Sequence, residues 1–401
     1  MHKPKRSLHI PLLLLATTAC TEPAASRHVA QAAPPPMECQ AGPPGARLRP
    51  SNGVWFGVNL DWSNDTPASY AERVGRRPAV VTQFARIPLA STDVGHLEAA
   101  VTQLEATGAM LLLTLEPHAG LDAVDTAAVD NVAALLARYN ARGVPVLLRF
   151  AHEMNGSWYP WSQQPAAYVA TFRRLAIAVH ARAHASAMLW APNYGGGYPF
   201  KGGRFMARVG SQDHAALDTN DDGRLDDHDD PYAPYYPGDD VVDWVGMSLY
   251  HWGNRYPWGA NAVPEPGKFA AMLSGSYRGS IGDESEIPDF HARYAQDRGK
   301  PLGIFETAAL YAPGRGGDAE MKVKSAWWRQ VYSADTRRQF PELAMINWFE
   351  WDKHEVEIQA RVDWGVSRTP ALRQAFQAAL PEWLLGGEAV ALCTRRVQPA
   401  N

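Results

Sequence analysis

Cysteines, excess charge of either sign and long hydrophobic runs are all scarce in this chain of 401 residues. It has three cysteines and a formal net charge of −4, from 38 basic and 42 acidic side chains. A charge this small provides no broad basic surface, so we expect neither nucleic acid nor anionic lipid as a partner. The apolar run at residues 8–16 is too short to span a bilayer. A Gly-rich phosphate loop is also missing after the first predicted strand, which argues against a dinucleotide-binding sheet.

The amino-terminal residues have the order of an export signal. A short basic segment precedes the apolar run, and small residues follow it just before Cys20. We therefore expect residues 1–19 to be a signal peptide, and the protein to be secreted or attached to the outer surface of the cell. Cys20 also resembles a lipoprotein acceptor, so a lipid anchor is the alternative to release. Export favours a disulfide between the two other cysteines, Cys39 and Cys393.

The remaining chain is predicted to be a linker followed by one catalytic domain. Residues 20–51 are rich in alanine and proline without periodicity, which is typical of a linker. Within residues 52–401, short apolar runs alternate with amphipathic stretches, including predicted helices at 94–107, 124–142, 165–185 and 319–333. The eight predicted strands are residues 54–60, 79–87, 109–115, 144–150, 187–191, 242–250, 302–306 and 343–349. This alternation predicts a (β/α)8 barrel, with an open doubly wound sheet as the alternative.

Two carboxylates lie at the ends of predicted strands. Glu153 comes directly after the fourth strand, and Glu306 closes the seventh, where burial would normally exclude an acidic side chain. Strand ends gather at one mouth of a barrel, so the two side chains are expected to face each other. Retaining glycosidases use such a pair about 5 to 5.5 Å apart. We therefore predict Glu306 as the nucleophile and Glu153 as the acid/base, with its pKa raised by the charge of Glu306.

The aromatic content is consistent with a carbohydrate substrate. The chain has 14 Trp and 15 Tyr, more aromatic surface than a core of this size needs. Flat aromatic side chains stack on the apolar faces of sugar rings. We therefore expect a polysaccharide as the partner. We also expect the protein to be a monomer.

The segment around Glu153 resembles glycoside hydrolase family 26, whose members are mostly β-1,4-mannanases of a retaining barrel clan. The family motif Arg-x-x-His-Glu-x-Asn-Gly-x-Trp matches this chain residue for residue from Arg149 to Trp158. The resemblance covers roughly residues 52–380. It implies endo-cleavage of mannan, galactomannan or glucomannan through a covalent intermediate, without a cofactor. It also implies that Arg149, His152 and Trp158 bind the substrate.

The same resemblance assigns roles to three further residues. His118 is similar to a substrate-site histidine after the third strand, and Tyr250 to a tyrosine that donates a hydrogen bond to the nucleophile. Trp348 is similar to the tryptophan platform under the sugar that is cleaved. The Thr-Ala-Ala sequence after Glu306 and the Trp-rich segment after Tyr250 depart from the family pattern. Cleavage of β-1,3-xylan or mixed-linkage β-glucan therefore stays open, as does a lipoprotein that binds glycans without cutting them.

A second motif, independent of the first, has the pattern of a calcium-binding loop at residues 218–229. Gly223 supplies the sharp turn, and Asp at the last position replaces the usual Glu, as in dockerin loops. Calcium would have a structural role here, because the proposed reaction needs no metal. The predicted ligands are Asp218, Asn220, Asp222, the carbonyl of Arg224, Asp226 and Asp229.

Overall fold

The structure is a computed structural model that describes residues 47–279 and 287–394. The described residues belong to one compact unit. The predicted signal peptide, the lipid site at Cys20 and the disulfide between Cys39 and Cys393 lie outside what the structure describes. Among the helices of the described residues, none has the length and apolarity needed to cross a membrane.

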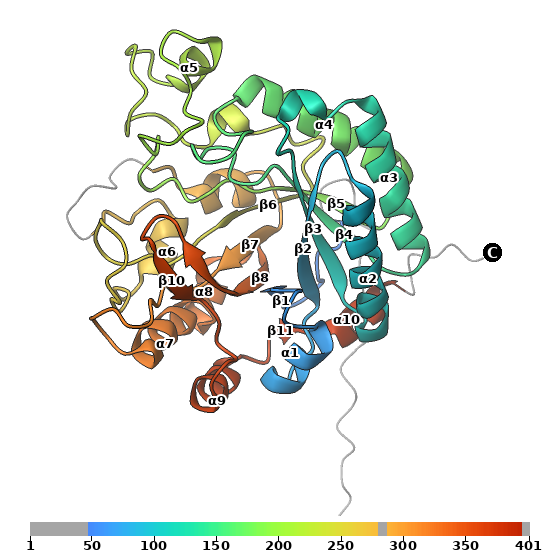
Figure 1. Cartoon of the computed structure of the whole chain (residues 1–401), viewed down its shortest axis with the longest axis vertical. Coiled ribbons are helices and arrows are strands. Elements are labelled where there is room, and N and C mark those ends of the chain that lie inside the picture. The colour runs from blue at the N-terminus through green and yellow to red at the C-terminus, as the bar shows by residue number, and fades with distance from the viewer. Residues whose placement is uncertain (1–46, 280–286, 395–401) are drawn as a thin grey trace, which may run out of the picture. The chain divides into compact units, whose positions relative to one another are not determined.

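Eight parallel strands form a closed barrel (Figure 1). They follow one another around the barrel in chain order, and the last strand pairs with the first from Trp55 opposite Met345 to Leu60 opposite Glu350. The predicted (β/α)8 barrel is therefore confirmed, and the open sheet is wrong. The barrel strands are β1 (Val54–Leu60), β2 (Val80–Arg86), β3 (Met110–Glu116), β4 (Val146–Phe150), β5 (Ser186–Trp190), β6 (Trp244–Ser248), β7 (Leu302–Thr307) and β8 (Leu343–Glu350).

Helices connect the strands and cover the outside of the barrel. The α-helices are α1 (Pro67–Val74), α2 (Ser91–Thr107), α3 (Thr126–Ala141), α4 (Pro165–Arg182), α5 (Gln212–Leu217), α6 (Lys268–Leu273), α7 (Glu320–Val331), α8 (Ala334–Gln339), α9 (Pro370–Ala379) and α10 (Gly387–Thr394). Two 3-10 turns, η1 (Leu121–Ala123) and η2 (Ala233–Tyr235), and one π-helix, η3 (His291–Gln296), add to these. Three short strands complete the fold: β9 (Asp352–Glu355) and β10 (Ala360–Asp363) form a hairpin, and β11 (Leu384–Leu385) pairs with β1.

Local sequence sets several of the helix ends. The side chain of Asp125 caps α3 by accepting a hydrogen bond from the backbone N–H of Ala128 at 2.8 Å. Pro165 occupies the first turn of α4, where its missing N–H costs nothing. Gly108 ends α2 in the left-handed conformation, with φ of 72°, which glycine adopts without strain.

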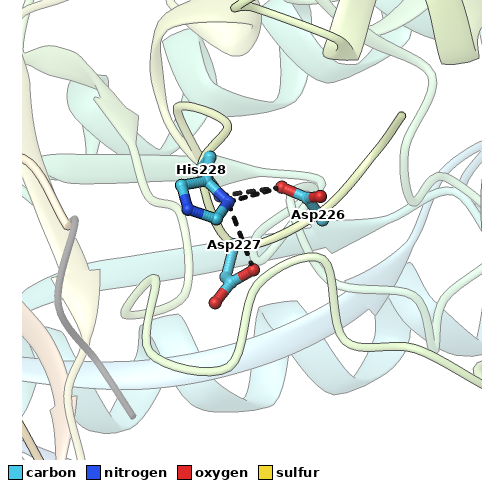
Figure 2. A group of neighbouring side chains, drawn as sticks. All are labelled: Asp226, Asp227 and His228. Carbon is cyan, nitrogen blue, oxygen red and sulfur yellow. Dashed lines mark hydrogen bonds and ion pairs between the residues drawn. The ribbon is translucent and has the colours of Figure 1, made fainter. Parts of the chain in front are cut away.

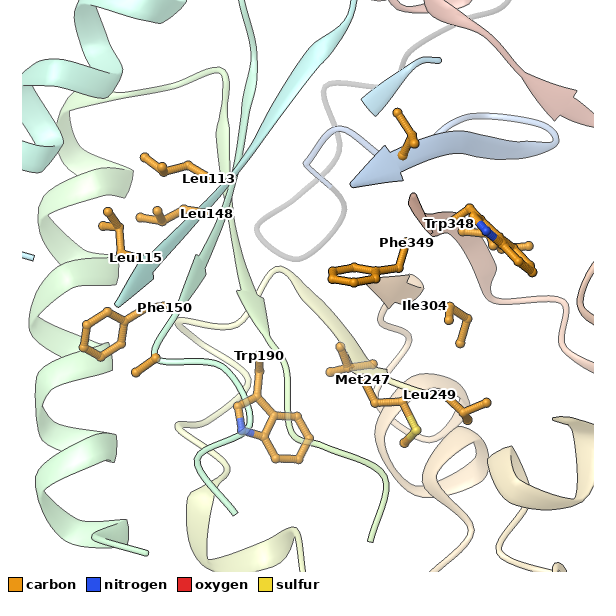
Figure 3. Close-up of a cluster of buried hydrophobic side chains, with 14 of the residues drawn as sticks. Leu113, Leu115, Leu148, Phe150, Trp190, Met247, Leu249, Ile304, Trp348 and Phe349 are labelled. Atoms are coloured by element: carbon orange, nitrogen blue, oxygen red, sulfur yellow. The ribbon is translucent and has the colours of Figure 1, made fainter. Parts of the chain in front are cut away.

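Alternating side chains divide the core into two layers. One side of each strand faces the inside of the barrel, and the other faces the helices. Figure 3 shows part of the outer layer, with Leu113 and Leu115 of β3 beside Leu148 and Phe150 of β4. The inner cluster has members from neighbouring strands, among them Trp55, Leu112, Leu147, Trp244 and Met345. The parity of a residue in its strand therefore decides whether its side chain can reach the mouth of the barrel.

Strand β7 departs from this alternation at a bulge. Ile304 pairs with Ile346 of β8, but the next pair is Thr307 with Trp348, so β7 contains one extra residue in this interval. Two consecutive side chains consequently face inward: Phe305 joins the inner cluster and Glu306 contacts Arg149 of β4. Bulges of this kind redirect side chains next to active sites. The bulge places Glu306 at the mouth.

Candidate active site

The carboxylate of Glu306 is held by side chains from three other strands or strand ends. Its Oε1 accepts hydrogen bonds from Arg149 Nη2 at 2.5 Å and Asn59 Nδ2 at 3.5 Å. Its Oε2 accepts a hydrogen bond from the Tyr250 hydroxyl at 2.6 Å. Only 8% of the Glu306 side chain is exposed. Three donors on a nearly buried carboxylate fix its orientation and suit its anionic form.

Arg149 lies behind this carboxylate and has no contact with solvent. Its side chain is fully buried, its Nε donates to Thr114 Oγ1 at 2.9 Å, and its guanidinium lies 5.6 Å from the ring centre of Phe84. Arg149 was expected to bind the substrate, whereas the structure buries its side chain completely behind Glu306. Arg149 instead compensates the charge of Glu306 and sets the position of that carboxylate.

Glu153 lies on a strained turn that follows β4. Ala151 and Glu153 both have positive φ, of 46° and 55°, a conformation that non-glycine residues rarely adopt. Hydrogen bonds to both neighbouring strand ends hold this turn: the N–H of Ala151 donates to the Leu115 carbonyl, and the N–H of Glu153 to the Ala191 carbonyl. These hydrogen bonds keep Glu153 in a backbone conformation that it would rarely adopt on its own.

The surroundings of Glu153 suit a proton donor. Burial, followed by the charge of Glu306, raises the pKa of Glu153 to about 7. Glu153 directly follows β4, and Glu306 is in the last residues of β7. Trp158 Nε1 donates a hydrogen bond to Glu153 Oε2 at 3.0 Å, which opposes the increase. Trp158 is also 37% exposed, so its ring remains accessible beside the carboxylate.

Aromatic and imidazole rings form a wall next to Glu153. Tyr159 and Trp161 stack with centroids 4.4 Å apart, and His152 lies 5.1 Å from Tyr159. Only 3% of His152 is exposed, and burial, followed by the charge of Arg149, holds the pKa of its imidazole well below the ordinary value. His152 thus packs as a neutral ring and leaves little surface for a substrate. His118, which is 48% exposed, contacts the edge of Trp161 and can be reached from the mouth.

Trp348 does not form a platform for a sugar. Its side chain is fully buried and packs against Tyr332 and Phe376, in the outer layer shown in Figure 3. The expectation fails because Trp348 pairs with Thr307, whose hydroxyl contacts Trp327 in the helix layer, so both side chains point away from the barrel interior. Trp351, directly after β8, is partly exposed instead.

Several residues that contact the site were not identified from the sequence. Trp351 Nε1 donates to Asn59 Oδ1 at 3.1 Å, and Asn59 in turn reaches Glu306. Trp351 also stacks on Phe349 with centroids 5.9 Å apart. A third carboxylate, Glu116, closes β3. The criterion that identified Glu306, an acidic residue at the end of an apolar run, would also have identified Glu116.

The predicted calcium ligands lie together in the loop between α5 and η2, and several are engaged with the loop backbone. Asp218 Oδ1 and Asn220 Oδ1 both accept from the N–H of Asp222 at 3.1 Å, and Asp229 accepts from Thr219 and Asp226. Oxygen donors gathered in this way suit calcium chemically. In the described part of the chain, the group with ligand atoms within 4.8 Å of one another is Asp226, Asp227 and His228, shown in Figure 2. Of these three, only Asp226 belongs to the predicted set.

Comparisons with known proteins identify relatives of this barrel. The family model of glycosyl hydrolase family 26 matches residues 88–193, which include β3, β4 and Glu153. Endoglucanase H of Acetivibrio thermocellus is 23% identical over 337 residues, an alignment that covers 82% of this chain and 30% of the relative. The chain thus spans about a third of the length of that relative.

Solved structures share the fold. A modular endo-β-1,4-mannanase from Cellulomonas fimi superposes with a TM-score of 0.52 and 17% identity, covering 84% of this chain and 72% of that one. GH26C from Muricauda sp. MAR_2010_75 superposes with a TM-score of 0.50 and 12% identity, covering 84% and 88%. At these identities the likeness concerns the arrangement of the barrel.

Proposed function

Since the chain belongs to glycoside hydrolase family 26, we propose that it is a retaining endo-hydrolase of a β-linked polysaccharide, with Glu306 as nucleophile and Glu153 as acid/base. The observation that carries this proposal is the difference between the two carboxylates at one mouth. Glu306 is held by Arg149 and Tyr250, whereas burial and the charge of Glu306 raise the pKa of Glu153 to about 7. Two carboxyl groups with different environments can divide the roles of nucleophile and acid.

In the first step a Glu306 oxygen attacks the anomeric carbon of the sugar. The bond from that carbon to the glycosidic oxygen breaks, and Glu153 transfers its proton to the departing oxygen. The products are a glycosyl ester on Glu306 and a shortened chain with a free hydroxyl group. Tyr250 and Arg149 keep the attacking carboxylate in one orientation, which limits the reorganisation that the step requires.

In the second step water replaces Glu306 at the anomeric carbon. Esterification removes the negative charge of Glu306, so the pKa of Glu153 falls and its carboxylate can accept a proton from water. The ester bond then breaks and Glu306 leaves as a carboxylate. Two displacements at the same carbon return the original β configuration.

We propose a β-1,4-mannan backbone as the substrate, in mannan, galactomannan or glucomannan. The likeness to the Cellulomonas fimi mannanase supports this choice at the level of the fold. A β-glucan backbone is the second candidate, because the relative from Acetivibrio thermocellus is named an endoglucanase. Hydrolysis assays on galactomannan, glucomannan, mixed-linkage β-glucan and β-1,3-xylan distinguish the candidates. Cleavage of mixed-linkage β-glucan without cleavage of either mannan would contradict the mannanase proposal.

The assignment of the two carboxylates is tested by chemical rescue. Glu153→Ala should retain glycosylation of an aryl glycoside with an acidic phenol, which needs little protonation, while deglycosylation slows. Azide should then restore turnover and give a β-glycosyl azide, whereas Glu306→Ala should give no β-azide and almost no activity. An α-azide from Glu306→Ala, with no azide product from Glu153→Ala, would exchange the two assignments. Inverted configuration in the first wild-type product would exclude the retaining mechanism.

We also propose three properties of the rest of the chain. Residues 1–19 direct export, Cys20 is the site of a lipid anchor if one is attached, and residues 52–401 act as a monomeric catalytic domain after the linker. The order of basic, apolar and small residues supports export. Mass spectrometry of the mature amino terminus tests cleavage and lipidation together.

Calcium bound by residues 218–229 would neutralise the clustered carboxylates and stabilise the loop, with no part in the reaction.

A further inference from the structure

Glu116 occupies the inner face of β3 at the level of the mouth. Thr114, two residues earlier, pairs with Arg149 across β3 and β4 and accepts its hydrogen bond inside the barrel. Leu115 between them points to the helix layer (Figure 3). Alternation therefore turns Glu116 to the same side as Thr114, one layer nearer the opening. Only 17% of its side chain is exposed.

The Glu116 carboxylate has little to compensate its burial. Within residues 47–279 and 287–394, its side-chain hydrogen-bond partner is His118 Nε2, at 3.3 Å. Arg86, opposite Glu116 on β2, turns instead to Asp93 and Thr92. His118 is itself 48% exposed, and a half-exposed contact of this length contributes little against the cost of burying a carboxylate. Stability alone therefore gives no reason for an acidic residue here.

The electrostatic surroundings connect Glu116 with the two other carboxylates. Burial raises its pKa, the nearby His118 and Arg149 oppose the increase, and the charge of Glu306 adds to it. The charges of Glu153, Glu116 and Glu306 all contribute to raising the pKa of Tyr159, after burial. Glu116 thus lies within electrostatic reach of Arg149, Glu306 and the aromatic wall, although the proposed reaction steps do not use it.

We propose that Glu116 is a substrate-binding residue whose carboxylate accepts hydrogen bonds from adjacent hydroxyl groups of a sugar unit in the mouth. A carboxylate has two acceptor oxygens, so it can receive hydrogen bonds from two neighbouring hydroxyl groups of one pyranose ring. His118 Nε2 contacts one of these oxygens at 3.3 Å. This inference rests on the proposed hydrolase function and adds a determinant of substrate binding to it.

Binding and kinetics of Glu116→Gln test the inference. Calorimetry in the inactive Glu306→Ala background, with mannohexaose and with a mixed-linkage glucan hexasaccharide, should show affinity reduced by about 10- to 100-fold for the bound sugar, the loss expected for hydrogen bonds to a charged group. In the otherwise wild-type enzyme, KM should rise by a similar factor while kcat changes by less than about threefold. Glu72→Gln, on the exposed surface of α1, is the matched control and should change neither.

The outcomes separate this inference from the proposed function. Wild-type cleavage with unchanged KM and affinity in Glu116→Gln would overturn the role of Glu116 and leave the hydrolase proposal intact. Equal losses of kcat on all substrates, with a lowered melting temperature and unchanged affinity, would show a structural role and also overturn it. If the wild type cleaves none of the four polysaccharides, the hydrolase proposal fails, and the calorimetric comparison still decides whether Glu116 binds sugar.

Discussion

At the scale of single residues, the environment of each carboxyl group defines what it can do. Glu306 accepts hydrogen bonds from Arg149, Asn59 and Tyr250, all of which suit an anion. Glu153 accepts a hydrogen bond from Trp158 and, because of burial and the charge of Glu306, has a pKa raised to about 7. The positive φ of Glu153 adds backbone strain that the surrounding strands must compensate. Residues of the same type therefore acquire different chemistry from their neighbours.

The pKa of Glu153 predicts the alkaline side of the pH profile. Glu153 must be protonated to act as the acid, so kcat/KM should fall as the pH rises above about 7. Trp158→Phe removes a hydrogen bond that favours the ionised carboxylate. The pKa of Glu153 should therefore increase. The alkaline limb of the kcat/KM profile should then shift to higher pH by about half a pH unit. The measurement is the pH dependence of kcat/KM on an oligosaccharide.

The control for this prediction is Trp383→Phe, at a residue whose carbonyl accepts a hydrogen bond from β1 outside the proposed site. That variant should keep the wild-type profile. A shift of the Trp158→Phe limb to lower pH would contradict the proposed role of this hydrogen bond.

Trp348 and Trp351 should respond in opposite ways to truncation. Trp348→Ala leaves a large cavity beside Phe376 and should lower the free energy of unfolding by about 3 to 5 kcal/mol, with little change in KM. Trp351→Ala, at the partly exposed end of β8, should raise KM and lower stability much less. Urea unfolding and oligosaccharide kinetics on both variants measure these effects. If Trp348→Ala were as stable as the wild type but bound sugar poorly, our assignment of Trp348 to the core would be wrong.

At the scale of elements, strand pairing determines which side chains meet. The bulge in β7 turns both Phe305 and Glu306 inward, although neighbouring residues of a regular strand point in opposite directions. The turn after β4 is fastened to β3 and β5 by backbone hydrogen bonds. The two carboxylates therefore owe their positions to irregular features at the ends of regular strands.

The loop at residues 218–229 provides a prediction about an element. Calcium at 100 times its dissociation constant should stabilise the protein by about 2.7 kcal/mol, and a chelator should lower the melting temperature of a calcium-loaded sample. Asp218→Asn combined with Asp222→Asn should abolish the response, because both residues belong to the predicted ligand set.

Asp227→Ala combined with His228→Ala is the comparison variant for the loop. It removes two members of the cluster in Figure 2 that are not predicted calcium ligands, and it should retain the response to calcium. If only this second variant lost the response, calcium would be bound by the cluster of Asp226, Asp227 and His228 and not by the predicted ligands.

At the scale of the whole molecule, the carboxyl-terminal segment closes the barrel at the end opposite the mouth. Leu384 and Leu385 pair with the first residues of β1, and Ala389 and Val390 of α10 join the inner cluster together with Trp55. Residues from the two ends of the domain thus share one core. The segment contributes to stability, while the reactive groups lie at the other ends of the strands.

Val390→Asp should destabilise the whole barrel. The substitution places an unpaired charge in the inner cluster, and we expect the free energy of unfolding to fall by about 3 kcal/mol or more. Val356→Asp, at a residue that is 68% exposed between β9 and β10, is the matched control and should change it by less than about 0.5 kcal/mol. Denaturation in urea measures both. Equal stability of the two variants would mean that α10 does not contribute to the core.

The sequence by itself determined the barrel and the location of its chemistry. Alternating apolar runs and amphipathic stretches are a local property, and parallel strands joined by helices necessarily gather their carboxyl ends at one edge. The positions of Glu153 and Glu306 at the ends of β4 and β7 follow from that pattern alone. The motif that includes Arg149 and Trp158 could likewise be recognised without coordinates.

Only the tertiary structure decided which side chains face the mouth and how they interact. The period of two within a strand is visible in the sequence, but the inward parity depends on pairing with neighbouring strands. This is why Trp348 was expected at the substrate and lies in the outer layer, and why Arg149 lies behind Glu306. The pKa of Glu153 likewise results from burial and from the charge of Glu306, which lies 153 residues away in the sequence, and neither is a property of the local sequence.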